Sequence, residues 1–153
     1  MNDLAIRAAT TADAPALLAL SQRMANFDLP PWRTPAEITE ADGSAMVTAL
    51  SRGDPDSEVF IAERHGAVAG CLHLVVTADF FGRAHAHISV IATSEAAEGS
   101  GVGRALIAFA DNWARQRRLP IITLNVFATN ARARRLYEQA GFEVELLKYA
   151  KQL

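Results

Sequence analysis

Apolar and polar residues recur along this chain with two different periods, and the changes of period mark the predicted elements. Residues 58–63, 67–76 and 84–92 form short apolar runs bounded by turn residues, which is typical of strands. From 102 to 113, apolar side chains recur at steps of three and four, which places them on one face of a helix. The pattern therefore predicts a hairpin, a third strand and a long amphipathic helix.

Caps and turn signals predict the remaining elements. Thr34, Pro35 and Glu37 form a capping box that begins a helix, and Gly43 is a point at which this helix can break. Two prolines make 27–33 a loop, which we expect to fold over a site. The other expected elements are strands at 4–7, 121–127 and 142–149 and helices at about 10–26, 34–50 and 131–140. Asn130 is expected to cap the last of these helices, and Gly141 is its expected left-handed C-cap.

The order of these elements indicates the fold class. A strand, two helices, three strands, and then helix, strand, helix and strand suggest a mixed α/β sheet with helices on both faces. The chain has 153 residues, half of them hydrophobic, so we expect one domain over 1–153 with a substantial core.

Composition limits the partners and the compartment. A net charge of −2 gives no electrostatic case for a nucleic-acid partner. The single cysteine, Cys71, cannot form an internal disulfide and is expected to be a core thiol. We find neither the pattern of a signal peptide nor an apolar run of about 20 residues. The expectation is a cytoplasmic protein with no membrane partner.

A glycine cluster, Gly99, Gly101 and Gly103, stands directly before the amphipathic helix. Glycine lets a backbone approach a ligand closely, and the first turn of a helix offers unpaired N–H groups at its positive end. Arg104 adds a full positive charge. The stretch indicates a phosphate or pyrophosphate cradle. A flexible loop that merely caps the helix is the alternative interpretation.

Three other glycine-rich loops fit this cluster less well. A P-loop ends in Gly-Lys-Ser/Thr, but Gly103 is followed by Arg104 and Ala105. A dinucleotide fingerprint that begins at Gly99 needs a glycine where Arg104 stands. A methyltransferase-like Gly-x-Gly-x-Gly does match, but the polar run 93–98 separates it from the strand, and too little chain follows for several more strand–helix units.

The stretch from Glu98 to Gly103 resembles the Gln/Arg-x-x-Gly-x-Gly/Ala pyrophosphate loop of the GNAT superfamily of N-acetyltransferases. It departs from that pattern at Glu98, whose carboxylate we expect to point to solvent. A second segment, from Asn130 to Phe142, resembles the family pattern Asn-x-x-Ala-x-x-x-Tyr-x-x-x-Gly-Phe. Two motifs at compatible spacing are more specific than either alone.

The resemblance implies a GNAT-like α/β fold: a mixed, mostly antiparallel sheet of six to seven strands, with a splay between the fourth and fifth. It implies acetyl-CoA as the donor, with its pantetheine between the strands at 85–92 and 121–127, and no metal. The cofactor-binding residues that it assigns are Ile91, Ala92, Thr93, Gly99, Ser100, Gly101, Val102, Gly103, Arg104, Asn130, Ala133 and Tyr137.

The resemblance also assigns Tyr137 as the acid that protonates the departing thiolate, with a core tyrosine as the alternative. An oxyanion needs a positioned donor, and the backbone N–H of Ile91 or Ala92 is the expected source.

The base is harder to assign. Many family members carry a glutamate where Ser89 stands, and serine is not a base at neutral pH. Alternation places His85, His87 and Ser89 on one face of the strand, so His87 is the candidate to relay a proton through water. A structural histidine and a water relay without any base are the alternatives.

These residues predict an acetyl-CoA-dependent N-acetyltransferase in which a primary amine attacks the thioester directly within a ternary complex. A non-catalytic acyl-CoA-binding or regulatory module is the alternative, and the methyltransferase reading predicts S-adenosylmethionine binding instead. The acceptor is a small amine or a peptide, with Asp28 and Trp32 as candidate substrate-binding residues. A homodimer through the C-terminal strand is the family-level expectation.

Overall fold

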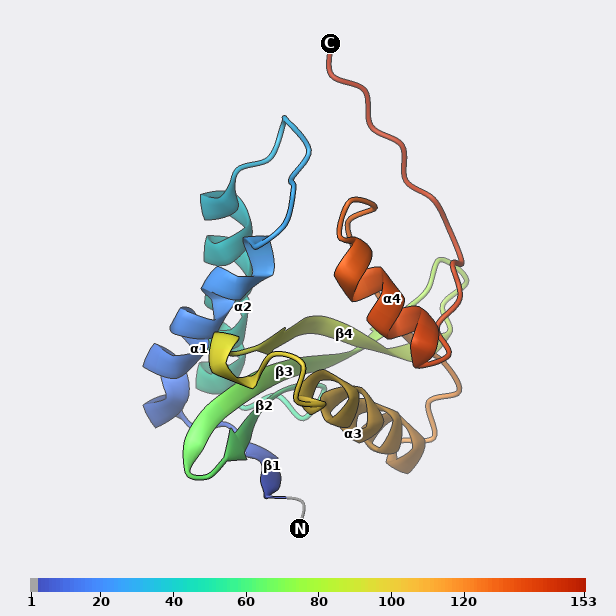
Figure 1. The fold of residues 1–153 in the computed structure, drawn as a ribbon. Coiled ribbons are helices and arrows are strands. Elements are labelled where there is room, and N and C mark those ends of the chain that lie inside the picture. The colour runs from blue at the N-terminus through green and yellow to red at the C-terminus, as the bar shows by residue number, and fades with distance from the viewer. Residues whose placement is uncertain (1–2) are drawn as a thin grey trace.

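Five strands form one sheet in the order β1-β2-β3-β4-β5 in the computed structural model, which describes residues 3–153 (Figure 1). Strands β1 to β4 pair antiparallel, and β5 runs parallel to β4. The strands are β1 (Leu4–Ala8), β2 (Ser57–Arg64), β3 (Ala67–Ala78), β4 (Ala84–Thr93) and β5 (Ile122–Leu124). The helices are α1 (Ala14–Ser21), α2 (Pro35–Arg52), α3 (Val102–Gln116) and α4 (Ala131–Gln139), with 3₁₀ turns η1 (Thr11–Asp13), η2 (Gln22–Ala25) and η3 (Glu95–Ala97).

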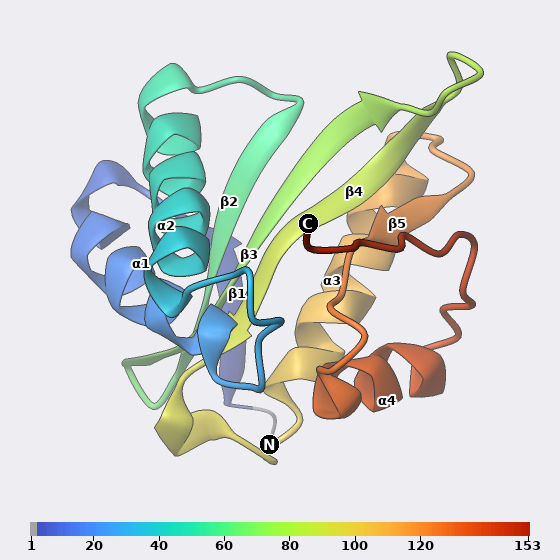
Figure 2. The same cartoon turned by 90° about the horizontal axis from the view of Figure 1, so that it is seen from above.

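Helices cover both faces of the sheet, as the element order predicted. Helices α1 and α2 pack on one face and α3 on the other (Figures 1 and 2). Leu72 and Leu106 belong to the core under α3, whereas Leu17, Met46 and Cys71 belong to the core under α1 and α2. Burial raises the pKa of the Cys71 thiol to about 12, which confirms a core cysteine.

The capping box that opens α2 is confirmed. The Thr34 N–H donates to Glu37 Oε2 at 2.8 Å, and the Glu37 N–H donates to Thr34 Oγ1 at 3.3 Å. The break expected at Gly43 is wrong, because α2 runs unbroken through it. A Cβ there would lie 3.0 Å from Leu18 Cδ2 and 3.2 Å from Ser21 Oγ, so this glycine lets α1 and α2 pack closely.

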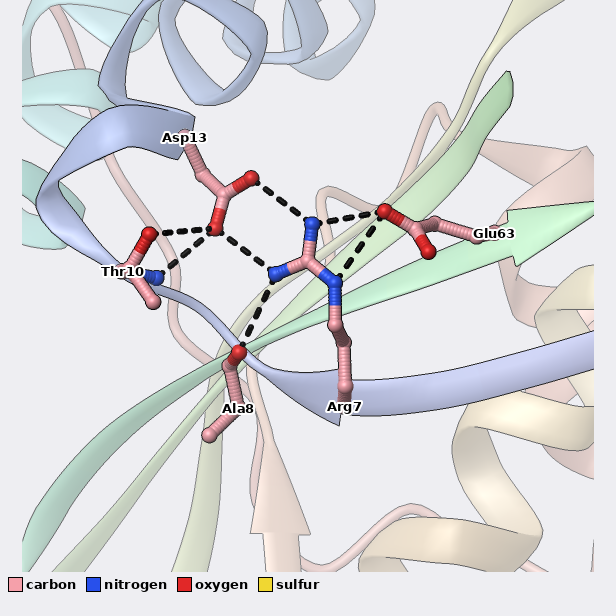
Figure 3. Close-up of polar contacts among 5 residues, drawn as sticks. All are labelled: Arg7, Ala8, Thr10, Asp13 and Glu63. Atoms are coloured by element: carbon pink, nitrogen blue, oxygen red, sulfur yellow. Dashed lines mark hydrogen bonds and ion pairs between the residues drawn. The ribbon is translucent and has the colours of Figure 1, made fainter. Parts of the chain in front are cut away.

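An ion-pair cluster fixes the start of the first helical segment to the sheet (Figure 3). The Arg7 guanidinium donates to both carboxylate oxygens of Asp13, at 2.8 and 2.9 Å, and to Glu63 at 2.6 Å. Hydrogen bonds from Arg7 and then from Thr10 hold the pKa of the Asp13 carboxyl well below its ordinary value. The cluster joins β1, β2 and η1.

The C-terminal strand expected at 142–149 is wrong, so the sheet has five strands instead of six to seven. The segment after α4 is extended and exposed, and it runs away from the sheet (Figure 1). A strand needs a neighbour to satisfy its backbone, and within residues 3–153 this segment has none in the sheet. The strand expected at 121–127 is likewise reduced to the three residues of β5.

Within residues 3–153, every helix is either too short or too polar to cross a bilayer.

Candidate cofactor and acceptor site

The expected gap between the fourth and fifth strands is present. Strand β4 pairs with β5 only from Ala86 to Ile88, whereas it pairs with β3 along its whole length to Thr93. Within residues 3–153, the edge of β4 that faces β5 therefore has no strand partner from Ser89 onward. Unpaired strand backbone of this kind can hydrogen-bond a ligand that offers amides in an extended array.

A β-bulge lies at the start of this free edge. In the pairing with β3, His73 is opposite Val90 and Leu74 is opposite Ile88, so Ser89 is the extra residue. Alternation therefore breaks here, since Ile88 belongs to the core under α3 and Val90 to the core under α1 and α2. The expectation that Ser89 shares one face with His85 and His87 stays a prediction. Sequence alone does not reveal a bulge, because the bulge depends on the register with the neighbouring strand.

The direction of the backbone N–H groups shows which residues of β4 can hydrogen-bond a ligand in the gap. The Ser94 N–H donates to Ala69 O at 2.9 Å, on the β3 side. Because successive amides of a strand point in opposite directions, Ala92 also directs its N–H toward β3. Ile91 and Thr93 then present their backbone groups to the gap.

The loop before α3 has a backbone conformation that requires glycine. Gly99 and Gly101 have φ values of 71° and 86°, in the left-handed region that favours glycine. The first intrahelical bond runs from the Ala105 N–H to Gly101 O at 3.1 Å. No side chain of the described residues caps this helix, so the backbone N–H groups of its first turn are available to an anion. These are the N–H groups of Val102, Gly103 and Arg104.

Two glycines let this helix start approach its neighbours. A Cβ on Gly70 of β3 would lie 2.7 Å from Ala92 O and 3.1 Å from Val102 Cγ1. A Cβ on Gly103 would lie 3.1 Å from Leu136 Cδ2 of α4. The α3 N-terminus is thus packed between the sheet and α4. Sequence reasoning missed Gly70, because its role depends on contacts far along the chain.

Glu98 does not point freely to solvent as expected, because two arginines bind its carboxylate. Arg132 Nη1, in the first turn of α4, lies 2.8 Å from Glu98 Oε1. Arg23 of η2 donates to the same oxygen. Arg64 donates from both terminal nitrogens to the Ser100 carbonyl at 3.2 Å. The loop is therefore held by three guanidinium groups with one carboxylate among them.

Helix α4 carries the residues of the second motif. Asn130 Oδ1 accepts a hydrogen bond from the Ala133 N–H at 3.2 Å, which confirms Asn130 as the N-cap. Gly141 has φ 91° and ends the helix as a left-handed C-cap, as predicted.

The Tyr137 ring packs edge-on against Phe142, with centroids 5.9 Å apart. Burial raises the pKa of Tyr137 to about 12, so the phenol is protonated at neutral pH. Its role as the acid stays a prediction.

His87 is half-buried on β4 and paired with β5. The Thr123 hydroxyl donates to Ala86 O at 3.5 Å, which leaves its oxygen to accept from the His87 Nδ1–H at 2.8 Å. This network favours the tautomer in which Nε2 carries the lone pair. Burial, and then the charge of His85, lowers the pKa of His87 below 6.5. A neutral ring with a free nitrogen is what a base requires.

The loop between η2 and α2 reaches across to the segment after β5. The Phe27 and Phe127 rings lie 5.5 Å apart, at an interplanar angle of 41°. Asp28 is exposed and Trp32 is 42% exposed on the same loop, so both are accessible to an acceptor. Sequence reasoning expected this loop to cover a site but missed the pairing of the two phenylalanines.

A separate hollow of about 560 Å³ lies between η2 and α2, where its lining includes Gln22, Arg23 and Thr39. No residue of β4, β5 or α4 lines it. We place the chemistry at the strand gap instead, because the unpaired backbone and the uncapped helix meet there.

Comparisons with known proteins identify relatives of this chain. The sequence model of the Acetyltransferase (GNAT) family matches residues 20–142. A mycothiol acetyltransferase from Acidothermus cellulolyticus is 39% identical over 100 residues, a match that covers 58% of this chain and 30% of that protein. The chain spans less than a third of the length of the curated relatives that it matches.

Two solved structures share the fold over nearly the whole chain. A transcriptional regulator from Bacillus halodurans C-125 has a TM-score of 0.70 at 24% identity, with 98% of this chain and 99% of that chain covered. A ribosomal-protein-alanine N-acetyltransferase from Brucella melitensis biovar Abortus 2308 has a TM-score of 0.71 at 20% identity, with the same coverage. At these identities the similarity shows the fold alone.

Proposed function

The chain belongs to the Acetyltransferase (GNAT) family, and on that premise we propose that it transfers an acetyl group from acetyl-CoA to a primary amine. One observation carries the proposal: the free edge of β4 ends beside the uncapped N-terminus of α3, where a Cβ on Gly103 would lie 4.0 Å from Thr93 Cγ2. An extended chain of amides that ends in a diphosphate fits those two features in that order.

The residues fit acetyl-CoA as a co-substrate. Ile91 and Thr93 offer backbone groups to the pantetheine amides, and the amides of 102–104 offer donors to the diphosphate. Gly99 and Ser100 are exposed in the loop before these amides. Ala133 has a small side chain, which leaves room for the pantetheine beside α4. Arg104 donates to Gln139 Oε1 at 2.9 Å, so its charge lies between α3 and α4.

Direct attack needs a neutral amine, a donor for the oxyanion and an acid for the leaving sulfur. We assign the donor to the Ile91 N–H, because the Ala92 N–H is directed toward β3. We assign the acid to Tyr137, whose pKa of about 12 keeps the phenol protonated until the thiolate develops.

His87 is the proposed base. Its Nε2 takes a proton from the acceptor ammonium through water, while the Thr123 hydroxyl holds Nδ1–H. The low pKa keeps the ring neutral and ready near pH 7, but it also limits the driving force for proton transfer.

The acceptor reaches this point under the Phe27–Phe127 contact, with Asp28 and Trp32 as proposed binding residues. Asp28 offers a charge to a cationic amine. The names of two similar proteins suggest two acceptor classes to test: the amine used by mycothiol acetyltransferases and an alanine of a ribosomal protein. Other small amines are the third class.

A second candidate function is a non-catalytic acyl-CoA-binding module. Ser89 stands where many family members carry a carboxylate, and one structural neighbour is a transcriptional regulator. Under this alternative, acetyl-CoA binds and no acetyl group moves.

One experiment separates the two candidates. Acetyl-CoA and the protein are incubated with a panel of the three acceptor classes, and free thiol is measured. We expect thiol release that depends on an added amine. Calorimetric binding of CoA with no thiol release for any amine supports the module and contradicts the transferase.

A further inference from the structure

Glu98, in the loop before α3, forms ion pairs with residues of two different elements, η2 and α4. Its Oε1 accepts from Arg132 Nη1 of α4 at 2.8 Å and from Arg23 of η2. The three residues are far apart in sequence, and Glu98 lies three positions before Gly101, the N-cap of α3. We refer to Arg23, Glu98 and Arg132 as the clasp.

The members of the clasp differ in exposure. The Arg23 side chain is 22% exposed and the Glu98 side chain 30%, whereas the Arg132 side chain is 67% exposed. Arg23 is thus a largely buried anchor, and its Nε has no hydrogen-bond partner among the described residues. Arg132 keeps most of its guanidinium edge open. A guanidinium has five N–H donors, so the contact with Glu98 leaves others for a second anion.

The charge at the loop is positive despite Glu98. Arg23 and Arg132 neutralise the carboxylate and leave one excess positive charge, and Arg64 adds another at the Ser100 carbonyl. The α3 dipole points its positive end to the same place. Because the surrounding charge is positive, the repulsion between Glu98 and an incoming anion is small. The larger effect of the carboxylate is to hold the neighbouring arginines in place.

We propose that Glu98 is a positioning residue that strengthens diphosphate binding by holding Arg132 at the mouth of the α3 N-terminus. This inference rests on the proposed function, since it assumes that acetyl-CoA binds there. It departs from the plain electrostatic expectation, under which a carboxylate beside a diphosphate weakens binding. The two views predict opposite signs for the same substitution.

The clasp also connects the cofactor to the acceptor side. Arg23 lies in η2, immediately before the loop that carries Phe27 and Trp32. If Glu98 strengthens diphosphate binding through Arg132, then a bound diphosphate also strengthens the contacts of Glu98, including the one with Arg23. Diphosphate binding therefore stabilises η2. Cofactor binding then orders residues 26–34 before the acceptor arrives.

The test is a calorimetric double-mutant cycle with CoA, using Glu98→Ala, Arg132→Gln and the double variant. We expect each single variant to raise the Kd for CoA about tenfold, and the double variant to be no weaker than either. Arg135→Gln, on the same helix, is the matched control and should leave the Kd unchanged. Arg132 is mostly exposed, so its variant keeps the fold even if Glu98→Ala is less stable.

Several outcomes overturn the proposal. Unchanged or tighter binding by Glu98→Ala contradicts it, and so do additive losses in the double variant. We expect the same loss with 3′-dephospho-CoA, and a loss seen only with CoA assigns Arg132 to the 3′-phosphate and overturns the assignment. If the unaltered protein binds no CoA at all, the proposed function itself fails.

Hydrogen exchange gives a second readout. Residues 26–34 should exchange more slowly when CoA is added to the unaltered protein, and this protection should be lost in Glu98→Ala at saturating CoA. Protection that survives the substitution contradicts the link through Arg23.

Discussion

His73 Nε2 lies 2.9 Å from Ser57 Oγ, in the face of the sheet that α1 and α2 cover. The His73 side chain is 4% exposed, and its Nδ1 has no hydrogen-bond partner among the described residues. A buried imidazole with one unpaired nitrogen disfavours its charged form. Burial, and then the charge of His87, lowers the pKa of His73 to about 4.

This shift predicts acid sensitivity. The pKa of His73 is about 4 in the folded state against 6.5 for an ordinary histidine, so the unfolded chain binds more protons between these values. Stability is therefore full above pH 6.5 and falls as the pH drops toward 4. The loss is at most roughly 3.5 kcal/mol, since one pKa unit corresponds to about 1.4 kcal/mol.

Urea unfolding at several pH values measures this effect. His73→Gln keeps a polar atom near Ser57 and should flatten the dependence between pH 6.5 and 4. The unaltered protein, unfolded under the same conditions, is the reference. An equal slope in the His73→Gln protein contradicts the assignment.

Tyr137→Phe tests the acid. We expect kcat to fall roughly 100-fold with the KM for acetyl-CoA unchanged, because the ring contact with Phe142 is kept and only the proton is lost. With a pKa of about 12, ionisation of Tyr137 should cause no loss of activity up to about pH 10. The other tyrosine, Tyr149, is 88% exposed, so Tyr149→Phe is the control. Full turnover in Tyr137→Phe removes the acid role.

Gly70 and Gly103 should differ in their tolerance of a methyl group. At Gly70 the new Cβ meets the backbone oxygen of Ala92 at 2.7 Å, which cannot move without shifting β4. We expect Gly70→Ala to destabilise by roughly 1–3 kcal/mol. At Gly103 the nearest atom is the tip of Leu136 at 3.1 Å, which can rotate away, so Gly103→Ala should cost under about 1 kcal/mol. Chemical unfolding followed by tryptophan fluorescence measures both costs, and equal costs contradict this prediction.

The extended C-terminal segment predicts self-association. Val144, Leu146, Leu147 and Tyr149 are 66–88% exposed, and β5 pairs with a strand on only one side. A hydrophobic strand and an open sheet edge on one chain can satisfy each other between two copies. Sedimentation should show a dimer that becomes a monomer when 144–153 is deleted, whereas Leu153→Ser should stay dimeric. A monomeric unaltered protein, or a dimer that survives the deletion, contradicts the prediction.

Predictions from local signals are correct where the interaction itself is local. The capping box at Thr34 and the left-handed Gly141 depend on a few neighbouring residues, and the structure confirms them. The order of the elements likewise predicted helices on both faces of a mixed sheet.

Features that depend on distant partners were missed or wrong. The bulge at Ser89 exists only relative to β3, and the two arginines that bind Glu98 come from η2 and α4. The segment 142–149 has the composition of a strand, but a strand also needs an edge on which to pair. Composition does not specify that edge.

The central claim is that acetyl-CoA lies along the free edge of β4 with its diphosphate at the start of α3. Amide hydrogen exchange, measured by NMR with and without CoA, tests this most directly. The account predicts slower exchange at Ile91, Thr93 and the amides of 102–104, with Ala92 unchanged. Binding of CoA that leaves these amides unprotected, or that protects a different surface, contradicts it.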